Sequence, residues 1–256
     1  MAAHERNKYD ALIIPADLPV DSAVGFTTTR QGGVSCGLYD SWNLGDHVGD
    51  DPRLIARNRA QLTQYLPAMT RVRWLTQVHG THVVAAHAAC DGVEADAAWT
   101  DQPNIACAVM TADCLPVLLA SRTGPWVAAV HGGWRGLAGG VLEATISACP
   151  HPSESLCAWL GPAIGPTVFE VGEDVLAAFT IRYGAAISAY FQPLDSHHWL
   201  ADIYGLARSI LQQEGVHAVT GGNQCTYTDP TRFFSYRRDA ETGRMASVVS
   251  LPPSFS

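Results

Sequence analysis

Three apolar segments in the middle of the chain each end at a histidine or a cysteine that stands beside a glycine or a turn. They read TQV-His79-Gly80, TAD-Cys114 and AAV-His131-Gly132. Short apolar runs bounded by turn residues predict buried strands. Strand ends next to loops are where a rigid scaffold presents functional groups. We therefore take His79, Cys114 and His131 as the candidate active-site residues.

Predicted strands and helices are mixed along the sequence without strict β-α alternation. Strands are expected at 24–30, 72–78, 105–110, 126–130, 156–160 and 244–250, with another in VLLA after Cys114, and helices at 52–65, 137–149, 173–183 and 202–214. This order favours the α+β class with mixed sheets. Because no low-complexity linker or internal repeat divides the chain, we expect one domain over residues 1–256.

Composition excludes several classes of function. With 256 residues, of which 47% are hydrophobic and 16% charged, the chain is globular and can bury a sizeable core. Its formal net charge is −8 and it has no cluster of lysine or arginine, which argues against nucleic-acid binding. The longest apolar stretch, CAVMTADCLPVLLA, is interrupted by Asp113 and Pro116 and therefore cannot cross a membrane.

The cysteines predict a reducing compartment. Their number, seven, is odd, and no pair has the C-x-x-C spacing of a zinc knuckle or a redox motif. A chain of this length does not need disulfides to fold. The N-terminal sequence MAAHERNKYD has no apolar signal core, so we expect a cytoplasmic protein with reduced thiols.

Two chemistries are open to the three candidate residues if they meet in space. A thiolate and two neutral imidazoles suit Zn²⁺ and leave a fourth position for water or substrate, and Cu²⁺ also accepts such ligands. Alternatively, Cys114 is a nucleophile and one histidine is its base. Asp113 either orients a histidine or caps its own turn. His82, three residues after His79, is a competing ligand, and His47 could border the site from outside.

Two other segments are candidates for substrate binding. Arg135 lies in a glycine-rich turn at a predicted helix start, where it either binds an anion or is simply solvated. The segment FFSYRRD (233–239) joins aromatic rings to two guanidinium groups. It could stack a base and hold a polar substrate, or it could be the edge of an aromatic core.

Long blocks of the sequence resemble those of the YfiH/laccase-domain family. In chain order they are FTTTRQGGVSCGLYDSWNLGDHVGDD, TQVHGTHVV, ADAAWT, CAVMTADCLPVLLA, VAAVHGGWRGLAGGVLE, AWLGPAIGPTVFEVG and FFSYRRDAETGRMASVV. The resemblance extends from about Val24 to Val249. Members of this family carry the names polyphenol oxidase, purine nucleoside phosphorylase and peptidoglycan editing factor.

The resemblance implies a fold, a site and an activity. The fold is a single layered α/β/β/α domain, related to cysteine hydrolases of the CNF1 type. The metal site of the family falls on His79, Cys114 and His131. The implied activity is phosphorolysis of adenosine, inosine and methylthioadenosine, with some adenosine deamination. Two positions depart from the family pattern: Trp42 replaces an expected leucine and is predicted to narrow the pocket mouth, and Gly132 replaces an expected alanine.

A phosphorylase needs groups that hold phosphate, ribose and base. By residue type and place in the matched blocks, Arg30, Arg135 and Arg237 are the candidates for anion contacts, and Asn43 and Tyr236 for ribose or base. The expected partners are thus a purine nucleoside and phosphate, with no nucleic acid and no membrane, and no oligomeric state is predicted. The rival activities are hydrolysis of a wrong amino acid from a UDP-MurNAc precursor by Cys114 and copper-dependent phenol oxidation. A scaffold without enzymatic activity is the third class.

Overall fold

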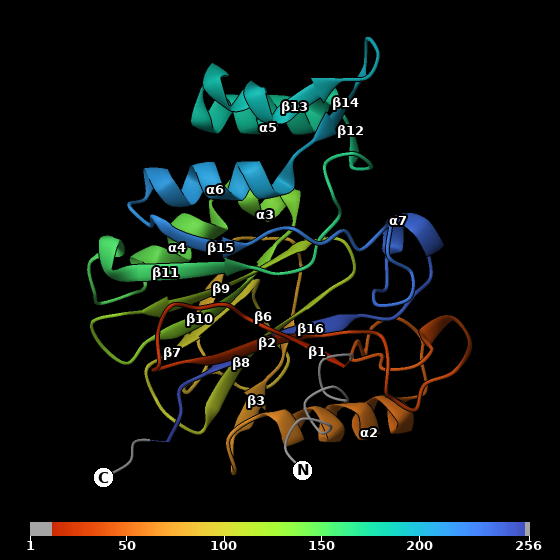
Figure 1. Ribbon diagram of the computed structural model, residues 1–256, viewed down its shortest axis with the longest axis vertical. Helices are drawn as coiled ribbons and strands as arrows, with labels where there is room; N and C mark the ends of the chain where they lie inside the picture. Colours follow the sequence, from red (N-terminus) through yellow and green to blue (C-terminus); the bar gives the residue numbers. More distant parts are fainter. Residues whose placement is uncertain (1–11, 254–256) are drawn as a thin grey trace, which may run out of the picture.

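Two mixed β-sheets lie face to face at the centre of the molecule in the computed structural model, which describes residues 12–253 (Figure 1). One sheet has the order β1 (Ile13–Pro15), β2 (Val24–Thr28), β16 (Met245–Ser250), β8 (Ile105–Thr111) and β3 (Arg71–Arg73). The other has the order β15 (Ala218–Gly221), β11 (Leu156–Leu160), β9 (Leu115–Ser121), β10 (Val127–Gly132), β7 (Ala97–Thr100) and β5 (Val83–Ala85). Inner strands pair antiparallel, whereas β3, β15 and β5 join their sheets in parallel. The predicted α+β class with mixed sheets is confirmed.

The apolar runs that predicted strands are buried on both faces of these sheets. Alternate residues of β8, such as Cys107 and Val109, face the other sheet and pack in one core with Leu118 and Ala129. The intervening residues of β8 point to the opposite face, where they form a second core with the end of helix α2 (Pro52–Leu62). Strands buried on both sides have no polar face, which explains why their sequences are continuously apolar.

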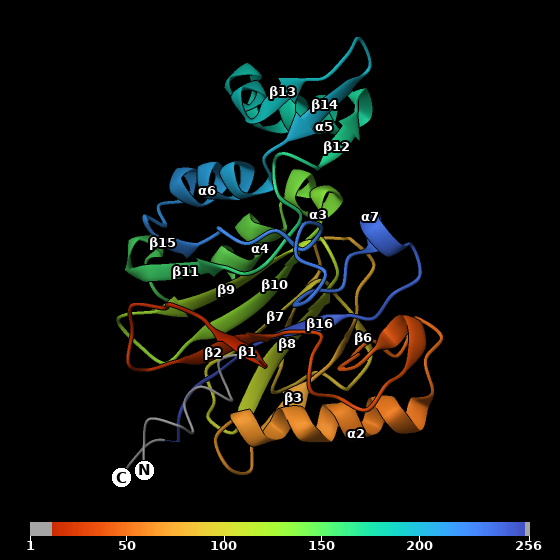
Figure 2. The same cartoon turned by 45° about the vertical axis from the view of Figure 1, so that its right-hand side comes forward.

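Helices cover both outer faces, which gives the layer order α/β/β/α. Helix α2 lies under the five-stranded sheet (Figure 2). The six-stranded sheet is covered by α3 (Trp134–Gly139), α4 (Val141–Ser147) and α6 (Ile203–Gln213), whose apolar residues share its outer core. This arrangement agrees with the layered fold that the resemblance implies. Among the described residues, no helix has the length and apolar character needed to cross a bilayer.

Helix boundaries follow local capping chemistry. Asp51 caps α2 by accepting a hydrogen bond from the backbone N–H of Arg53, and Pro52 occupies the first turn. The predicted end of this helix continues as a 3-10 turn, η2 (Thr63–Tyr65). The predicted helix at 137–149 is wrong in detail, because Gly140 has φ +102° and divides it into α3 and α4.

The upper part of the molecule in Figure 1 is a small layer that the sequence pattern did not predict in full. Helix α5 (Glu173–Tyr183) lies where it was expected. The strands beside it, β12 (Glu170–Gly172), β14 (His198–Ala201) and β13 (Phe191–Pro193), form a separate antiparallel sheet. They are three or four residues long, too short for periodicity to indicate them.

The predicted strand 72–78 also divides. Its first part is β3, in the five-stranded sheet, and its second part is β4 (Leu75–Thr76), which pairs with β6 (Val93–Glu94) in a two-stranded sheet. The chain then leaves regular structure before His79. One short helix, α7 (Tyr236–Asp239), precedes β16.

Candidate active site

His79, Cys114 and His131 lie together, with one ligand atom of each within 4.8 Å of the others. Cys114 Sγ is 3.8 Å from His79 Nε2, and the two imidazole rings meet edge to face with centroids 4.7 Å apart. His131 is buried, Cys114 half-buried and His79 exposed, so the cluster opens to solvent on the His79 side. The structure thus brings together the three residues that the strand-end pattern singled out.

The six-stranded sheet sets the positions of two of these residues. Cys114 directly precedes β9, in the turn that enters this strand from β8, and His131 lies in the neighbouring strand β10. The antiparallel register pairs His131 with Pro116 and Gly132 with Leu115, so Cys114 and His131 come from adjacent strands at the same end of the sheet. His79 comes from the loop after β4.

Asp96 holds both histidines, although the sequence analysis did not single it out. Its carboxylate accepts a hydrogen bond from His131 Nδ1 at 2.7 Å and others from the backbone N–H groups of His79 at 2.9 Å and Gly80 at 2.6 Å. The bond to Nδ1 leaves His131 Nε2 directed to the cluster. His79 has φ +60°, a left-handed conformation that is rare outside glycine. The convergence of the N–H groups on one carboxylate compensates this strain.

A buried aspartate in the apolar block ADAAWT was the available signal for Asp96, because a buried carboxylate needs donors. Asp113 was considered for this task, but it orients no histidine. Its carboxylate bonds to Thr226 Oγ1, Ser235 Oγ and the backbone N–H of Arg237. The residue that orients His131 is therefore Asp96.

The electrostatics of the cluster favour a charged pair. Burial acts to raise the pKa of Cys114, but the neighbouring His131 and His79 outweigh it and lower the pKa to about 6. Burial acts to lower the pKa of His131, but Cys114 and Asp96 outweigh it and raise the pKa to about 9. Burial likewise opposes ionisation of Asp96, yet hydrogen bonds from His131 and Gly80 hold the pKa of its carboxyl below the usual value. These shifts favour the thiolate of Cys114 at neutral pH, the form that binds metals and attacks electrophiles.

The cluster fits a metal ion in ligand type and in space. One thiolate and two imidazoles, with His131 oriented by a carboxylate, form a ligand set that suits a transition-metal ion and leaves a position open. Gly133 borders this space, because a Cβ atom on it would lie 2.9 Å from His79 Cδ2 and 3.3 Å from Cys114 Sγ. Within the described residues this is the one group of three such side chains. The competing histidine, His82, instead contacts the carbonyl of Glu94 at 2.8 Å.

A cavity of about 500 Å³ opens over the cluster. Three arginines border it, Arg135, Arg237 and Arg244. Its walls are otherwise largely aromatic and aliphatic: the remaining lining residues besides the cluster are His47, Gln77, Met110, Thr111, Ala112, Asp113, Trp134, Ile164, Phe169, Ile203 and Tyr236. A largely apolar pocket with a few convergent charged groups is typical of a small-molecule site.

Three of the five predicted substrate contacts line this cavity, namely Arg135, Tyr236 and Arg237. Arg30 and Asn43 are not among its lining residues. The guanidinium of Arg30 donates to the carbonyls of Asp40 and Pro230 and stacks on Phe234. Asn43 is buried, and its carboxamide oxygen accepts from the backbone N–H of Gly45 and of Arg244. Both residues organise loops around the cavity.

Four other residues that the sequence pointed to, or that it left out, lie in or near the cavity region. His47 borders the cavity, as considered. Arg244 was missed, since it lies in a matched block but next to a strand whose pattern signals only packing. The prediction that Trp42 narrows the pocket mouth is wrong: the indole is fully buried, packs against Tyr65 and donates to the carbonyl of Asn58 at 3.1 Å. Gly132 is required by close packing, since a Cβ there would lie 2.7 Å from the carbonyl oxygen of Leu115.

Comparison with known proteins places the whole arrangement in a family. A family model described as a multi-copper polyphenol oxidoreductase laccase matches residues 24–252. This chain belongs to that laccase family. A relative named purine nucleoside phosphorylase from Pseudomonas aeruginosa is 52% identical over 224 residues, which cover 88% of this chain and 91% of the relative. Another, purine nucleoside phosphorylase YfiH from Escherichia coli, is 47% identical over 241 residues, 94% of this chain and 98% of the relative.

Solved structures give the same result for the fold. A Neisseria meningitidis protein of the DUF152 family superposes with a TM-score of 0.90 at 49% sequence identity, over 94% of this chain and 99% of that one. The hypothetical protein YfiH of Bacillus licheniformis superposes with a TM-score of 0.85 at 25% identity, over 90% and 92%. The family resemblance expected from the sequence blocks is confirmed.

Proposed function

We propose that this chain is a purine nucleoside phosphorylase, acting as one catalytic domain over residues 1–256. It would convert a purine nucleoside and phosphate into the free base and ribose 1-phosphate. The observation that carries the proposal is the cavity itself, in which a His-Cys-His cluster and three arginines line one space of nucleoside size. The name of the relatives at 47–52% identity supports the same reaction.

The arginines of the cavity are suited to an anion. Arg135, Arg237 and Arg244 take part in none of the side-chain ion pairs formed within residues 12–253, unlike Arg59 or Arg182. Guanidinium groups that lack a carboxylate partner in a half-enclosed space attract a dianion and bind its oxygens in pairs. An acidic chain can hold such a locally positive pocket, because the field in a cleft depends on the nearest charges.

The other walls are suited to a purine and a ribose. Phe169 and Tyr236 offer aromatic rings, and Ile164 and Ile203 offer aliphatic surface. A flat heterocycle gains stacking and desolvation against such walls. The hydroxyl of Tyr236 and the imidazole of His47 supply polar groups at the border for ribose hydroxyls or ring nitrogens.

His79, Cys114 and His131 would hold Zn²⁺, or Cu²⁺ as the alternative, through His79 Nε2, Cys114 Sγ and His131 Nε2. When bound, the metal ion supplies a Lewis acid that polarises a phosphate oxygen. Asp96 keeps His131 in the tautomer that presents Nε2. The guanidinium groups orient the phosphate so that one oxygen faces C1′ of the ribose.

In the reaction a phosphate oxygen forms a bond to C1′ while the bond from C1′ to N9 of the purine breaks. The bonding electrons leave with the purine, which takes up the proton that the hydrogen phosphate gives up on forming the ester. Charge on the sugar becomes positive in the transition state, and the negative phosphate beside it stabilises that charge. We expect adenosine, inosine and methylthioadenosine as substrates, and deamination of adenosine as a side activity.

One observation favours a second candidate function. The lowered pKa of Cys114 and its contact with His79 describe an activated thiolate beside a base. Without metal, this pair could act as a cysteine hydrolase, and removal of a wrong amino acid from a UDP-MurNAc precursor is the candidate reaction. In that case chelators would not reduce the activity, whereas alkylation of Cys114 would.

The test is product analysis of purified protein incubated with inosine, with and without inorganic phosphate. The proposal expects hypoxanthine and ribose 1-phosphate in equal amounts, only with phosphate present. Equal release of hypoxanthine without phosphate would indicate a nucleoside hydrolase. No release from inosine, adenosine or methylthioadenosine, together with turnover of UDP-MurNAc-L-Ser, would replace the proposal by the second candidate.

A further inference from the structure

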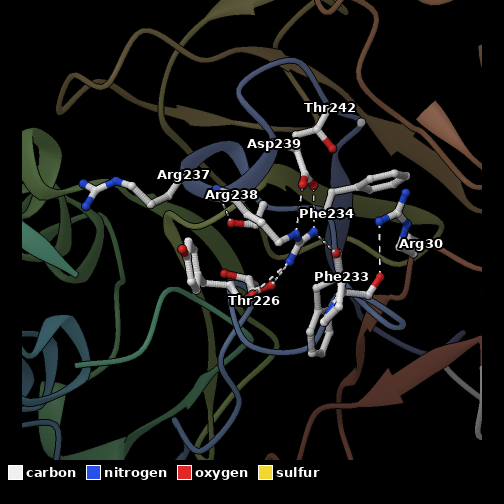
Figure 3. Close-up of polar contacts among 12 residues, drawn as sticks. Arg30, Thr226, Phe233, Phe234, Arg237, Arg238, Asp239 and Thr242 are labelled. Atoms are coloured by element: carbon white, nitrogen blue, oxygen red, sulfur yellow. Dashed lines mark hydrogen bonds and ion pairs between the residues drawn. The ribbon is translucent and has the colours of Figure 1, made fainter. Parts of the chain in front are cut away.

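The short helix α7 carries two cavity residues and two residues that point elsewhere. Tyr236 and Arg237 line the cavity. Figure 3 shows Arg237 extending away from the guanidinium of Arg238, which lies between the carboxylate of Asp239 and the loop around Thr226 and Phe233. Four helical residues form a single turn, and one turn has no stability of its own. The direction of Tyr236 and Arg237 must therefore be fixed by contacts from outside the helix.

Arg238 makes most of these contacts. Its Nη1 donates to the carbonyl oxygens of Thr226 and Tyr227 at 2.8 and 3.1 Å, and its Nη2 donates to the carbonyl of Phe233 at 2.9 Å (Figure 3). Nε and Nη2 also bind the carboxylate of Asp239 at 3.0 and 2.7 Å. The side chain is only 18% exposed. One guanidinium thus ties α7 to both ends of the preceding loop.

Asp113 completes the fixation from the side of the ligand cluster. It accepts from the backbone N–H of Arg237 at 2.7 Å and from Ser235 Oγ at 3.0 Å. Ser235 in turn caps α7 by accepting from the N–H of Arg238. Since Asp113 lies next to Cys114, α7 has a defined position relative to the cluster.

By contrast, the guanidinium of Arg237 has little support of its own. Among residues 12–253 it contacts only the carbonyl of Glu170, through a hydrogen bond of 3.0 Å, and the ring of Phe169, whose centroid lies 5.7 Å away. A guanidinium group with so few contacts takes its direction from the position of the backbone that carries it. Displacement of α7 would carry the guanidinium away from the anion site.

We propose that Arg238 is a positioning residue, which touches no substrate but holds α7 so that Arg237 and Tyr236 face the cavity. The inference rests on the proposed phosphorylase function, because it assigns Arg237 to the phosphate. Loss of the Arg238 contacts lowers the affinity for phosphate by misplacing Arg237, while the His-Cys-His cluster keeps its geometry. The effect therefore falls on KM for phosphate.

The experiment compares Arg238→Ala and Arg238→Lys with the wild-type enzyme in steady-state phosphorolysis of inosine. We expect Arg238→Ala to raise KM for phosphate about ten- to a hundredfold with a smaller change in kcat, since a displacement of about 1 Å has effects of this size. Arg238→Lys keeps the charge but reaches fewer carbonyls, so its KM for phosphate should lie between that of the wild-type enzyme and that of Arg238→Ala. Added guanidinium ion at millimolar concentration should fill the vacated space in Arg238→Ala and lower KM again.

The matched control is Arg232→Ala. Arg232 lies in the same loop, pairs with Asp229 at 2.6 Å and stacks on Phe233, but is not among the cavity residues. Removing its side chain tests whether loosening the loop is by itself sufficient to raise KM for phosphate. We expect this KM to change less than about twofold. A large rise in Arg232→Ala would overturn the specific role of Arg238.

A double variant separates positioning from an additive effect. If Arg238 acts through Arg237, then Arg237→Ala/Arg238→Ala should have nearly the same KM for phosphate as Arg237→Ala alone. Multiplicative effects, or an unchanged KM in Arg238→Ala, would overturn the inference while leaving the phosphorylase function intact. If the wild-type enzyme shows no phosphate-dependent cleavage, it is the proposed function that fails. Should Arg238→Ala not fold, Arg238→Lys and its double variant with Arg237→Ala answer the same question.

Discussion

The ligand cluster and the arginine wall of the same cavity are built in opposite ways. His131 and Cys114 take their positions from the register of β9 and β10, and Asp96 locks His131 and the His79 loop. The arginine wall consists of Arg135, Arg237 and Arg244. These residues come from three separate segments, two of which are the short helices α3 and α7. The cluster therefore has one rigid geometry, whereas the wall can change in parts. Substitutions in the cluster should abolish activity, whereas substitutions in the arginine wall should only reduce it, each by a limited factor.

The largest effect is expected from the ligands themselves. His79→Ala, Cys114→Ala and His131→Ala should each reduce nucleoside cleavage by roughly a thousandfold or more, because an open metal site needs all its protein ligands. Zinc content, measured by elemental analysis, should fall from about one ion per chain toward zero while circular dichroism stays native. His82→Ala is the control, since His82 lies outside the cluster. An inactive His82→Ala beside an active His79→Ala would refute the ligand assignment.

Asp96→Asn tests whether the cluster behaves as one unit. The amide would turn an N–H₂ group toward N–H donors and would remove the charge that His131 needs. We expect zinc affinity to fall about 10- to 100-fold and the free energy of unfolding to decrease by about 3 kcal/mol. Competition with a zinc chelator and urea unfolding measure the two quantities. Asp91→Asn, which affects a carboxylate that is largely exposed beside Arg73, is the matched control.

The arginine wall should respond in steps. Arg135→Lys and Arg237→Lys keep the charge but lose the planar fork that binds two phosphate oxygens, so each should raise KM for phosphate about tenfold. Initial rates at varied phosphate and saturating inosine provide the measurement. A complete loss of activity in either variant would remove the contrast between wall and cluster, because a single arginine would then be as essential for activity as a metal ligand.

The charged state of the cluster can be probed by pH in metal-free enzyme. Since the pKa of Cys114 is lowered to about 6, its thiolate should persist at neutral pH and be lost only as the pH falls through that value. Alkylation of the chelator-treated protein by iodoacetamide should therefore slow by about tenfold per pH unit below 6 and level off above it. Peptide mass spectrometry locates the adduct, and Cys114→Ala serves as the blank. A rate that still rises steeply between pH 8 and 9 would show an ordinary thiol.

The smallest effect on activity is expected at Trp42. Trp42→Leu shortens a side chain in the core between the five-stranded sheet and α2, away from the cavity lining. The free energy of unfolding should fall by about 2 kcal/mol, while kcat/KM stays within about twofold of wild type at a temperature below both transitions. Thermal unfolding and steady-state rates test this together. A changed KM for inosine would indicate that Trp42 affects the pocket mouth and would contradict this expectation.

Sequence reasoning succeeded where one residue type at a strand end was sufficient. The apolar runs before His79, Cys114 and His131 predicted strands that present these residues at their ends, and the α+β class followed from the order of elements. It failed where the signal lay in tertiary contacts. The short strands β12, β13 and β14 have no detectable period, and a single glycine, Gly140, divides a helix that looked continuous.

The same distinction explains the site residues that were missed or misplaced. Asp96 stands in a short apolar block, which indicates a buried carboxylate but does not identify its partners, 17 and 35 residues away. Arg30 and Arg244 are both arginines in matched blocks, yet only Arg244 lines the cavity. The difference is set by packing, because Arg30 is held on Phe234 by two carbonyls. Residue type predicts what a side chain can bind, and only the fold determines what it meets.

The shared carboxylate of Asp96 also dictates when the site can exist during folding. Asp96 directly precedes β7, and its bond to His131 requires β7 and β10 to be paired in the register that sets Ala97 opposite Val130. Contacts between residues this far apart in sequence form late, since loop closure has to precede them. Before β7 and β10 pair, the three ligands are therefore not assembled, and the nascent chain has no metal site. Zinc should arrive at an already paired sheet, and its binding should slow unfolding more than it speeds folding.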